Sequence, residues 1–305
     1  MQRYLLSRLV QSALILIGVL LLVFLMVRVT GDPAALMVSR EASPEQREAF
    51  REAMGFNRPL IVQFGDFVSG AVVGDFGSSL HHRRPALELI LDRLPATVEL
   101  AGVALLMALV IAIPLGLIGG SNPGSAVDSL ARAVGLVGQT IPNFWLALIL
   151  IIVFAVNLGW FPSFGRDTPA SVVLPAFALG LATMGQLVRL TRSAVLEIRS
   201  EDYIRTAQSK GLSATAISFN HVFRNAAIAL VSVIGVQFGY LLSGSIYIET
   251  IFSWPGLGNL LAQAVAGRDF PLVQAIAFFT SVVVIVLNLL TDVAYALIDP
   301  RIRYG

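Results

Sequence analysis

Long uncharged stretches alternate with short charged ones along the whole chain. A helix needs about 20 residues to cross the ~30 Å hydrocarbon core of a bilayer. Because lipid offers no partner to an open backbone, an uncharged run of that length predicts a helix. Six runs without Asp, Glu, Lys, Arg or His reach about that length: Leu9–Val27, Leu100–Val127, Ala133–Gly165, Thr168–Val188, Asn225–Ile248 and Phe270–Thr291. The pattern predicts six transmembrane helices, with the alternative that one run is a re-entrant or buried helix.

Composition supports the same class of protein. Of the 305 residues, 56% are hydrophobic and 13% are charged, and the mean hydropathy is +0.79. Soluble domains carry about 25% charged residues, so two soluble domains are excluded and an all-α polytopic membrane protein is predicted. The net charge of +2 gives no indication of nucleic-acid binding. The chain has no Cys, which excludes disulfides, iron–sulfur clusters and thiol catalysis.

The distribution of basic residues predicts the orientation. With the N-terminus inside, eleven bases lie in short cytoplasmic segments, whereas the short outside loops hold two, Arg166 and Arg268. The other eight lie between Arg28 and Glu99, in a segment too long for the positive-inside rule to apply. Both termini are therefore predicted to be cytoplasmic. The first run exceeds the length of a signal-peptide core and predicts a retained helix.

The long outside segment predicts two helices. Ser43-Pro44-Glu45-Gln46 is typical of a capped helix start, and this helix should run to Met54 and stop at Gly55. Pro59–Val73 has apolar residues near helical spacing and predicts the second. Ten acids between Asp32 and Glu99 indicate a solvated surface. It either packs over the helix ends or docks an outside partner.

Several kinds of chemistry lack the residues they require. A phosphate-binding P-loop needs Gly-Lys-Ser/Thr, but the only lysine, Lys210, lies between Ser209 and Gly211. Histidines occur only outside the apolar runs, so a Ser/His dyad or a zinc helix within the membrane has no histidine to use. The pair His81-His82 is interpreted as solvated rather than metal-binding. Among acids near the membrane, Glu249 is placed at the outer end of the fifth run.

The inside segment between the fourth and fifth runs predicts a helical elbow. Ser200 followed by two acids is typical of a capped start, and the first helix should cover Glu201–Lys210 and end at Gly211. Ser213 should cap a second helix, Ala214–Phe223. By residue pattern alone, this elbow either rests on lipid headgroups or inserts into a cytoplasmic partner.

The elbow sequence resembles the coupling segment of permease subunits in binding-protein-dependent ABC importers of the dipeptide/oligopeptide/nickel/glutathione family. The general importer motif has Glu-Ala-Ala, then Gly, then Ile-x-Leu-Pro, and here the Glu and the Ile-x-Leu-Pro are missing. The departures match the peptide branch, which is similar to Arg-Thr-Ala-x-x-Lys-Gly followed by His-x-x-Arg-Asn. The matching residues here are Arg205-Thr206-Ala207, Lys210-Gly211, His221 and Arg224-Asn225.

Other motifs extend the resemblance over almost the whole chain and in the same order as in that family. They are Gly31-Asp32-Pro33, Gly74–Ser79, Glu249–Gly258 and Asp299–Tyr304. The resemblance implies a type I ABC importer permease fold, with a first helix and large outer loop in residues 1–93. A five-helix transmembrane domain would follow in residues 94–298, containing the coupling segment 200–224, and then a cytoplasmic tail in 299–305.

The resemblance also implies function. The chain would form half of a translocation pathway for peptides or a related solute in a bacterial or archaeal cytoplasmic membrane. It would carry no cofactor or catalytic site, because ATP and Mg would bind to two partner ATPase subunits. The other implied partners are a second homologous permease subunit and an extracytoplasmic solute-binding protein. Residues implied to couple to the ATPase are Tyr203, Arg205, Thr206, Ala207, Lys210, Gly211, His221, Arg224 and Asn225.

Two other classes of protein remain as alternatives. A secondary, ion-coupled transporter usually has a detectable inverted repeat, and a polytopic membrane enzyme needs catalytic groups at depth. The chain shows neither feature. For an importer, the sequence does not distinguish among dipeptides, oligopeptides, glutathione, nickel, sugars and opines as the solute.

Overall fold

The computed structural model describes residues 2–29, 38, 43–53, 55–213 and 216–298, and every regular element in that part of the chain is helical. The motifs at Gly31-Asp32-Pro33 and in the tail 299–305 lie outside the described residues. The chain divides into two compact units. The first unit comprises residues 1–95 and 256–286, and the second comprises residues 96–255 and 287–305. Two long helices, α5 (Ala86–Ser121) and α14 (Phe270–Ile298), contribute to both.

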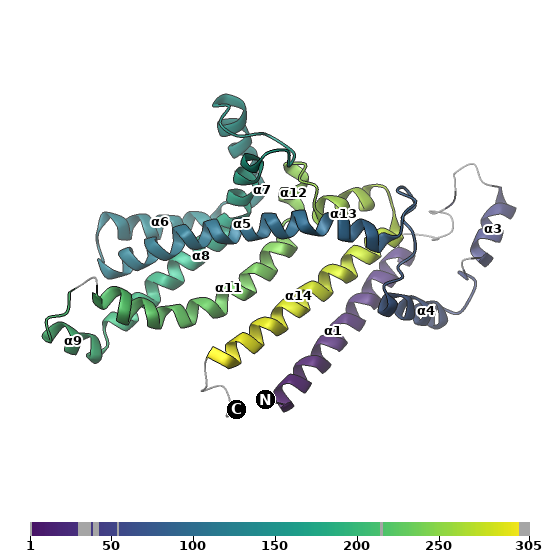
Figure 1. The fold of residues 1–305 in the computed structure, drawn as a ribbon. Helices are drawn as coiled ribbons and strands as arrows, with labels where there is room; N and C mark the ends of the chain where they lie inside the picture. Colours follow the sequence, from purple (N-terminus) through teal and green to yellow (C-terminus); the bar gives the residue numbers. More distant parts are fainter. Residues whose placement is uncertain (1, 30–37, 39–42, 54, 214–215, 299–305) are drawn as a thin grey trace. The chain divides into compact units, whose positions relative to one another are not determined.

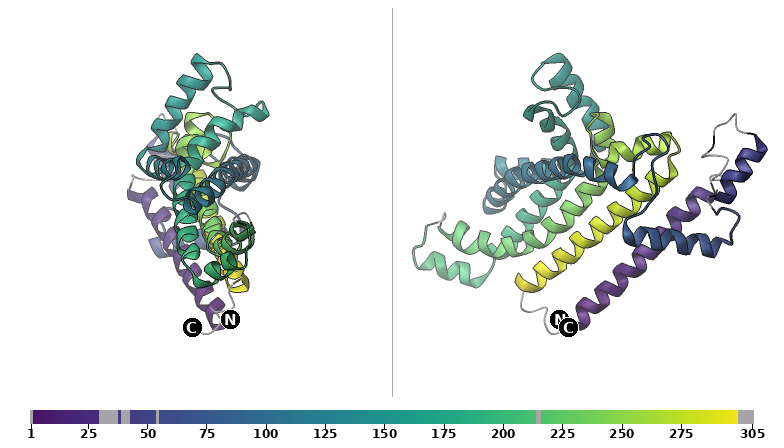
Figure 2. Two further views of the ribbon diagram at one scale, coloured as in Figure 1. Left: turned by 90° about the vertical axis from the view of Figure 1, so that its left-hand side faces the viewer. Right: turned by 45° about the vertical axis from the view of Figure 1, so that its right-hand side comes forward.

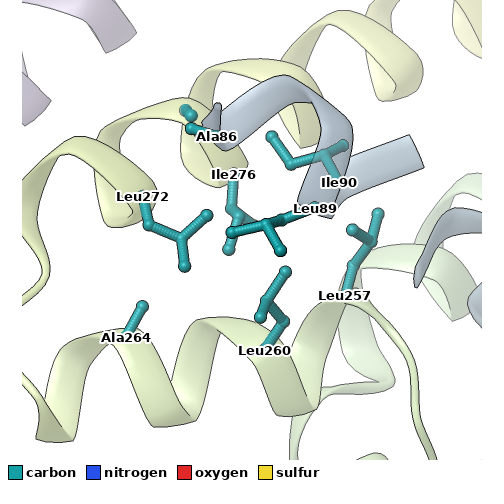
Figure 3. Close-up of a cluster of buried hydrophobic side chains, with 9 residues drawn as sticks. Ala86, Leu89, Ile90, Leu257, Leu260, Ala264, Leu272 and Ile276 are labelled. Atoms are coloured by element: carbon teal, nitrogen blue, oxygen red, sulfur yellow. The ribbon is translucent and has the colours of Figure 1, made fainter. Parts of the chain in front are cut away.

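The first unit contains α1 (Gln2–Val29), α3 (Pro44–Ala53), α4 (Leu60–Val73) and α13 (Leu257–Ala266), together with the start of α5 and most of α14. Helix α4 packs beside α1 (Figure 2), where the rings of Phe24 and Phe64 lie 5.3 Å apart. A buried apolar cluster joins α5, α13 and α14 (Figure 3), with Leu89, Leu260 and Ile276 facing one another.

Both helices predicted for the long outside segment are present. In α3, the Ser43 N–H donates to Gln46 Oε1 at 3.0 Å and the Gln46 N–H donates to Ser43 Oγ at 3.2 Å. This reciprocal pair is the predicted capping box. Helix α3 ends at Ala53, and Met54, its predicted last residue, lies outside the described residues. Gly55 has a left-handed backbone, with φ of 68°, as expected of a residue that stops a helix.

The second unit is built around α8 (Val173–Arg199), which contacts α6 (Ala126–Thr140), α7 (Asn143–Leu150), α11 (Arg224–Gly244) and α12 (Ile246–Ile251) (Figure 1). It packs tightly against α6. A Cβ added to Gly138 would lie 2.6 Å from the carbonyl oxygen of Leu181 and 3.1 Å from the Cα of Gly185. Small residues allow this backbone contact, as is typical of helix pairs in membranes.

Within the described part of the chain, three helices are long and apolar enough to cross a membrane: Ala86–Ser121, Pro169–Arg199 and Phe270–Thr291. The second of these begins with the short helix η2 (Pro169–Val172) and continues as α8. Among the described residues, α1 and α11 also carry the apolar stretches Val10–Met26 and Val233–Gly244. The prediction of an all-α membrane protein is therefore confirmed at the level of fold class, whereas the count of six spans stays a prediction.

The run Ala133–Gly165 is not one straight helix, which corrects the simplest interpretation of that run. Helix α6 ends at Thr140, and α7 continues into the π-helix η1 (Ile151–Asn157) after a bend of 107° (Figure 1). The break lies at Ile141-Pro142, where Ile141 has an extended backbone with φ of −85° and ψ of 122°. Proline disfavours a helical conformation for the residue before it and lacks the N–H that a continuing helix needs.

Candidate functional site

The elbow between α8 and α11 begins with α9 (Asp202–Ser209), close to its predicted bounds. The predicted cap is wrong by one residue. Ser200 keeps a helical backbone at the end of α8, and its hydroxyl donates to the Glu197 carbonyl at 2.6 Å. Glu201 has the extended backbone that precedes a helix, so it is the N-cap residue. Because α8 and α9 are so closely spaced, Ser200 is used to finish the first helix.

Gly211 ends α9 as predicted. Its φ is 77°, its N–H donates to the Gln208 carbonyl at 2.9 Å, and the Leu212 N–H donates to the Ala207 carbonyl at 3.3 Å. These two bonds close the end of the helix around a left-handed residue. A Cβ added at Gly211 would meet nothing within 4 Å. The position is therefore restricted by its backbone conformation and not by space.

The second arm of the elbow is longer than predicted. Ser213 Oγ accepts the Ala216 N–H at 3.2 Å, so its capping role is confirmed, while Ala214 and Thr215 lie outside the described residues. The π-helix η3 (Ile217–Phe223) passes directly into α11, because Arg224 is also helical, with φ of −58° and ψ of −40°. No Gly or Pro interrupts the chain there. The predicted separate helix is thus the first part of α11.

The elbow is fixed to the second unit by an apolar cluster. Ile204 and Ala207 of α9 are buried, and so are Leu117 of α5, Val195 of α8, Ile217 and Val222. Residues three apart lie on the same side of a helix, so Ile204 and Ala207 form the inner face of α9. Any displacement of α9 therefore moves side chains that contact α5, α8 and the π-helix that leads into α11.

The predicted coupling residues divide into three groups. Asn225 Nδ2 donates to the Tyr203 hydroxyl at 3.1 Å and to the His221 carbonyl at 2.7 Å, which brings those three residues together. Arg205, Thr206, Lys210, Gly211 and Arg224 are exposed, and Arg205 pairs with Asp202 at 3.4 Å. Ala207 is buried against the chain itself. The outer face of α9 is therefore polar and open.

An ion pair near the elbow was not predicted. Asp128, in the first turn of α6, is buried, and Arg192 of α8 donates to it from Nε at 2.5 Å and from Nη2 at 3.3 Å. The Gly124 N–H donates to the same carboxylate at 3.0 Å. The pair Ser125 and Asp128 indicates the start of a helix, because Ser125 accepts the Asp128 N–H. Local sequence does not indicate that Arg192, 64 residues later, pairs with Asp128.

Glu249, noted as an acid near the membrane, is fully buried in the second unit. Its Oε1 accepts hydrogen bonds from Thr97 at 2.8 Å and Ser245 at 2.9 Å. Nearby, Trp254 donates from its ring nitrogen to the Ala96 carbonyl at 2.8 Å. These bonds attach the segment after α11 to the beginning of α5, so the motif Glu249–Gly258 has a structural basis.

The histidine pair has ordinary hydrogen-bond partners in the first unit. His81 Nε2 lies 2.7 Å from the Gly267 carbonyl, and the His82 N–H donates to Ser79 Oγ at 3.0 Å. Within the described residues, no group of three or more His, Cys, Asp or Glu side chains is placed to hold a metal ion.

Comparison with known families identifies the class of protein. Residues 112–304 match the family of binding-protein-dependent transport system inner membrane components, and residues 1–101 match the family of their N-terminal regions. The chain belongs to this family and is a permease subunit of an ABC transport system. The resemblance inferred from the elbow motif is thereby confirmed.

Individual relatives are similar over their full length. The oligopeptide transport system permease protein AppB of Bacillus subtilis is 39% identical over 316 residues, covering 100% of both chains. The glutathione transport system permease protein GsiC of Escherichia coli K12 is 40% identical over 305 residues, again covering 100% of both. A putative peptide transport system permease protein of Brucella abortus is 39% identical over 313 residues.

Two solved structures share the fold. One is the inward-facing MetNI methionine ABC transporter, with a TM-score of 0.59 and 19% identity over 69% of this chain and 96% of that chain. The other is an amino acid ABC transporter, with a TM-score of 0.54 and 17% identity over 68% of this chain and 93% of that chain. These similarities support the predicted permease fold of ABC importers.

Proposed function

We propose that this chain forms one half of the translocation pathway of an ABC importer for peptides or a peptide-like solute such as glutathione. Relatives named for oligopeptide and glutathione transport match its full length at 39% and 40% identity. A second permease subunit, two ATPase subunits that bind ATP and Mg, and an extracytoplasmic solute-binding protein complete the transporter. Family membership does not favour the alternative of an ion-coupled secondary transporter.

The proposed arrangement has six membrane crossings with both termini in the cytoplasm. The bent pair of α6 with α7 and η1 counts as one crossing, and the distribution of eleven bases against two supports the orientation. The absence of Cys provides a clean background for labelling. In intact cells, Ser163→Cys should react with a membrane-impermeant thiol reagent while Ser121→Cys should be shielded. The reverse pattern would contradict the orientation.

The observation that carries the proposal is the construction of the elbow. Its outer face is polar and exposed, its inner face is packed onto α5 and α8, and its second arm is continuous with α11. A partner that moves the outer face of α9 would therefore move the membrane helices with it. The chain has no P-loop of its own, so we assign ATP hydrolysis to the partner subunits.

Reconstitution of the four transporter subunits in liposomes, with the solute-binding protein added, tests this function. Labelled trialanine or glutathione should be taken up only with ATP. Gly211→Val should weaken ATPase association or leave hydrolysis without uptake, because a β-branched residue opposes the left-handed backbone by about 1–2 kcal/mol. The matched control is Gly211→Asn, since Asn adopts this conformation more readily. Uptake driven by an ion gradient without ATP would overturn the proposed function, and normal uptake by Gly211→Val would overturn the coupling role.

A further inference from the structure

The exposed side of α8 is polar throughout. Helix α8 is the most enclosed of the candidate membrane helices, and 78% of the 18-residue stretch tested for membrane spanning is buried. At 3.6 residues per turn, its exposed residues lie within an arc of about 80° on one face. These exposed residues are Gln186, Arg189, Ser193 and Glu197. The polar face of α8, as we call these four residues, runs from the apolar run Thr168–Val188 toward the elbow.

A chain of hydrogen bonds fixes the membrane end of this face. Thr183 Oγ1 donates to Gln237 Oε1 at 3.3 Å, and Gln237 Nε2 donates to Gln186 Oε1 at 2.7 Å. Thr183 and Gln237 are buried, and Gln237 lies in the middle of the uncharged run Asn225–Ile248. Gln186 Oε1 thus accepts a hydrogen bond from the buried Gln237, and the Gln186 amide nitrogen donates to no other described residue. Its two N–H groups remain on the exposed side.

Arg189 adds further donors three residues along. A Cβ added at Gly135 would lie 2.7 Å from Arg189 Cγ, so the aliphatic stem of the arginine rests against α6. Among the described residues, Arg189 forms no ion pair or hydrogen bond. Arginine carries five N–H donors and no acceptor. The polar face of α8 therefore offers N–H donors to an acceptor-rich partner.

Lipid is not a suitable neighbour for such a face. Polar groups within a membrane protein usually face its interior or a water-filled cavity, because hydrocarbon provides no hydrogen bonds. Contacts between membrane helices favour small residues instead, as in the α6–α8 contact at Gly138 and Gly185. The polar face of α8 has long side chains with unused donors. Water and a passing solute satisfy those donors best.

We propose that the polar face of α8 lines the aqueous path of the transporter, with Gln186 and Arg189 donating hydrogen bonds to carbonyl and carboxylate oxygens of the solute. Gln237 is a positioning residue, since it holds the Gln186 amide with its N–H groups outward. The inference rests on the proposed function and adds to it the residues that contact the solute and the chemistry that they recognise.

Thiol labelling of the full complex in liposomes, assembled with cysteine-free partner subunits, tests the aqueous path. Gln186→Cys and Ser193→Cys should react with 2-sulfonatoethyl methanethiosulfonate at least about tenfold faster than Leu136→Cys and Val110→Cys, because a thiol in apolar surroundings stays protonated and inert. The two control positions are also exposed in this chain, at 65% and 64%. Slow labelling of both test positions in the complex, with fast labelling in the isolated chain, would mean that a second permease subunit covers this face and would overturn the inference.

Uptake kinetics test the solute contacts. Gln186→Leu should raise the apparent KM for trialanine by roughly threefold to tenfold, which corresponds to the loss of one hydrogen bond. Gln186→Asn, which keeps an amide group, should raise this KM less. Gln237→Leu should raise the KM for trialanine in the same way and change the maximal uptake rate less than it changes KM. Arg189→Gln should weaken uptake of trialanine more than uptake of trialanine amide, which lacks the carboxylate. Unchanged KM values in a complex that still imports trialanine with ATP would overturn this inference alone, whereas uptake without ATP would overturn the proposed function.

Discussion

Helices α5 and α8 both run through the second unit, but α5 turns apolar side chains outward and α8 turns polar ones outward. Only 33% of the apolar 18-residue stretch of α5 is buried, whereas 78% of the corresponding stretch of α8 is buried. From Leu100 to the end of α5, every exposed residue is apolar, namely Leu106, Val110, Ile111, Pro114 and Ile118. The exposed residues of α8 are Gln186, Arg189, Ser193 and Glu197.

The contrast shows that hydropathy and burial carry different information in this protein. Both helices contain an uncharged run long enough to cross a bilayer, so a window of hydropathy treats them alike. The apolar residues of α8 are used to pack against α6, α7 and α11, whereas many of those on α5 face outward. An apolar outer face suits lipid, and a polar outer face suits water. Three substitutions test this difference, from the largest expected effect to the smallest.

The largest effect is expected for a charge placed on the outer face of α5. Val110→Arg should make membrane insertion less favourable by about 2.5–3.5 kcal/mol, because Val110 is 64% exposed near the middle of an uncharged run. The matched variant Gln186→Arg, on the polar face of α8, should insert almost normally. Quantifying folded protein in the membrane fraction measures both. Equal losses for the two variants would remove the distinction between the helices.

A smaller effect is expected for a methyl group placed in the α6–α8 contact. Gly138→Ala should destabilise the protein by about 1–3 kcal/mol, because the added Cβ would lie 2.6 Å from the Leu181 carbonyl and the backbones would have to separate. Gly102→Ala on α5 is the control. Its added Cβ meets nothing within 4 Å, and alanine favours the helix by up to about 1 kcal/mol. Thermal unfolding in detergent should show a lower Tm for the first variant only.

The smallest effect is expected for the hydrogen-bond chain behind the polar face of α8. Thr183→Val keeps the shape of the buried side chain but removes the hydroxyl that donates to Gln237 at 3.3 Å. Interhelical hydrogen bonds in membranes contribute about 0.6 kcal/mol on average, so the Tm should fall only slightly. The control is Thr140→Val on α6, whose hydroxyl donates only within its own helix and is exposed. A larger loss for the control would contradict a link between α8 and α11.

Features that depend on neighbouring residues were readable from the sequence. The capping box of Ser43 and Gln46, the helix end at Gly55 and the left-handed Gly211 all follow from local hydrogen bonding and backbone sterics. The break at Ile141-Pro142 has the same kind of cause, although the long uncharged run obscured it. The sequence predicts the cap at Ser200, one residue before its position at Glu201, because the end of one helix and the start of the next compete for the same short segment.

The sequence by itself determined the class of protein, its helical runs and the elbow that resembles a coupling segment, because hydropathy, charge and turn chemistry act over a few residues. Only the tertiary structure decided which face each helix buries. It placed Arg192 on Asp128, Thr97 and Ser245 on Glu249, and Gln237 behind Gln186. Each of these arrangements joins different helices, except for the bond from Ser245. The local sequence does not indicate whether a polar residue in an apolar run faces lipid, water or a neighbouring helix. Packing between segments that are distant in the sequence determines which of these it faces.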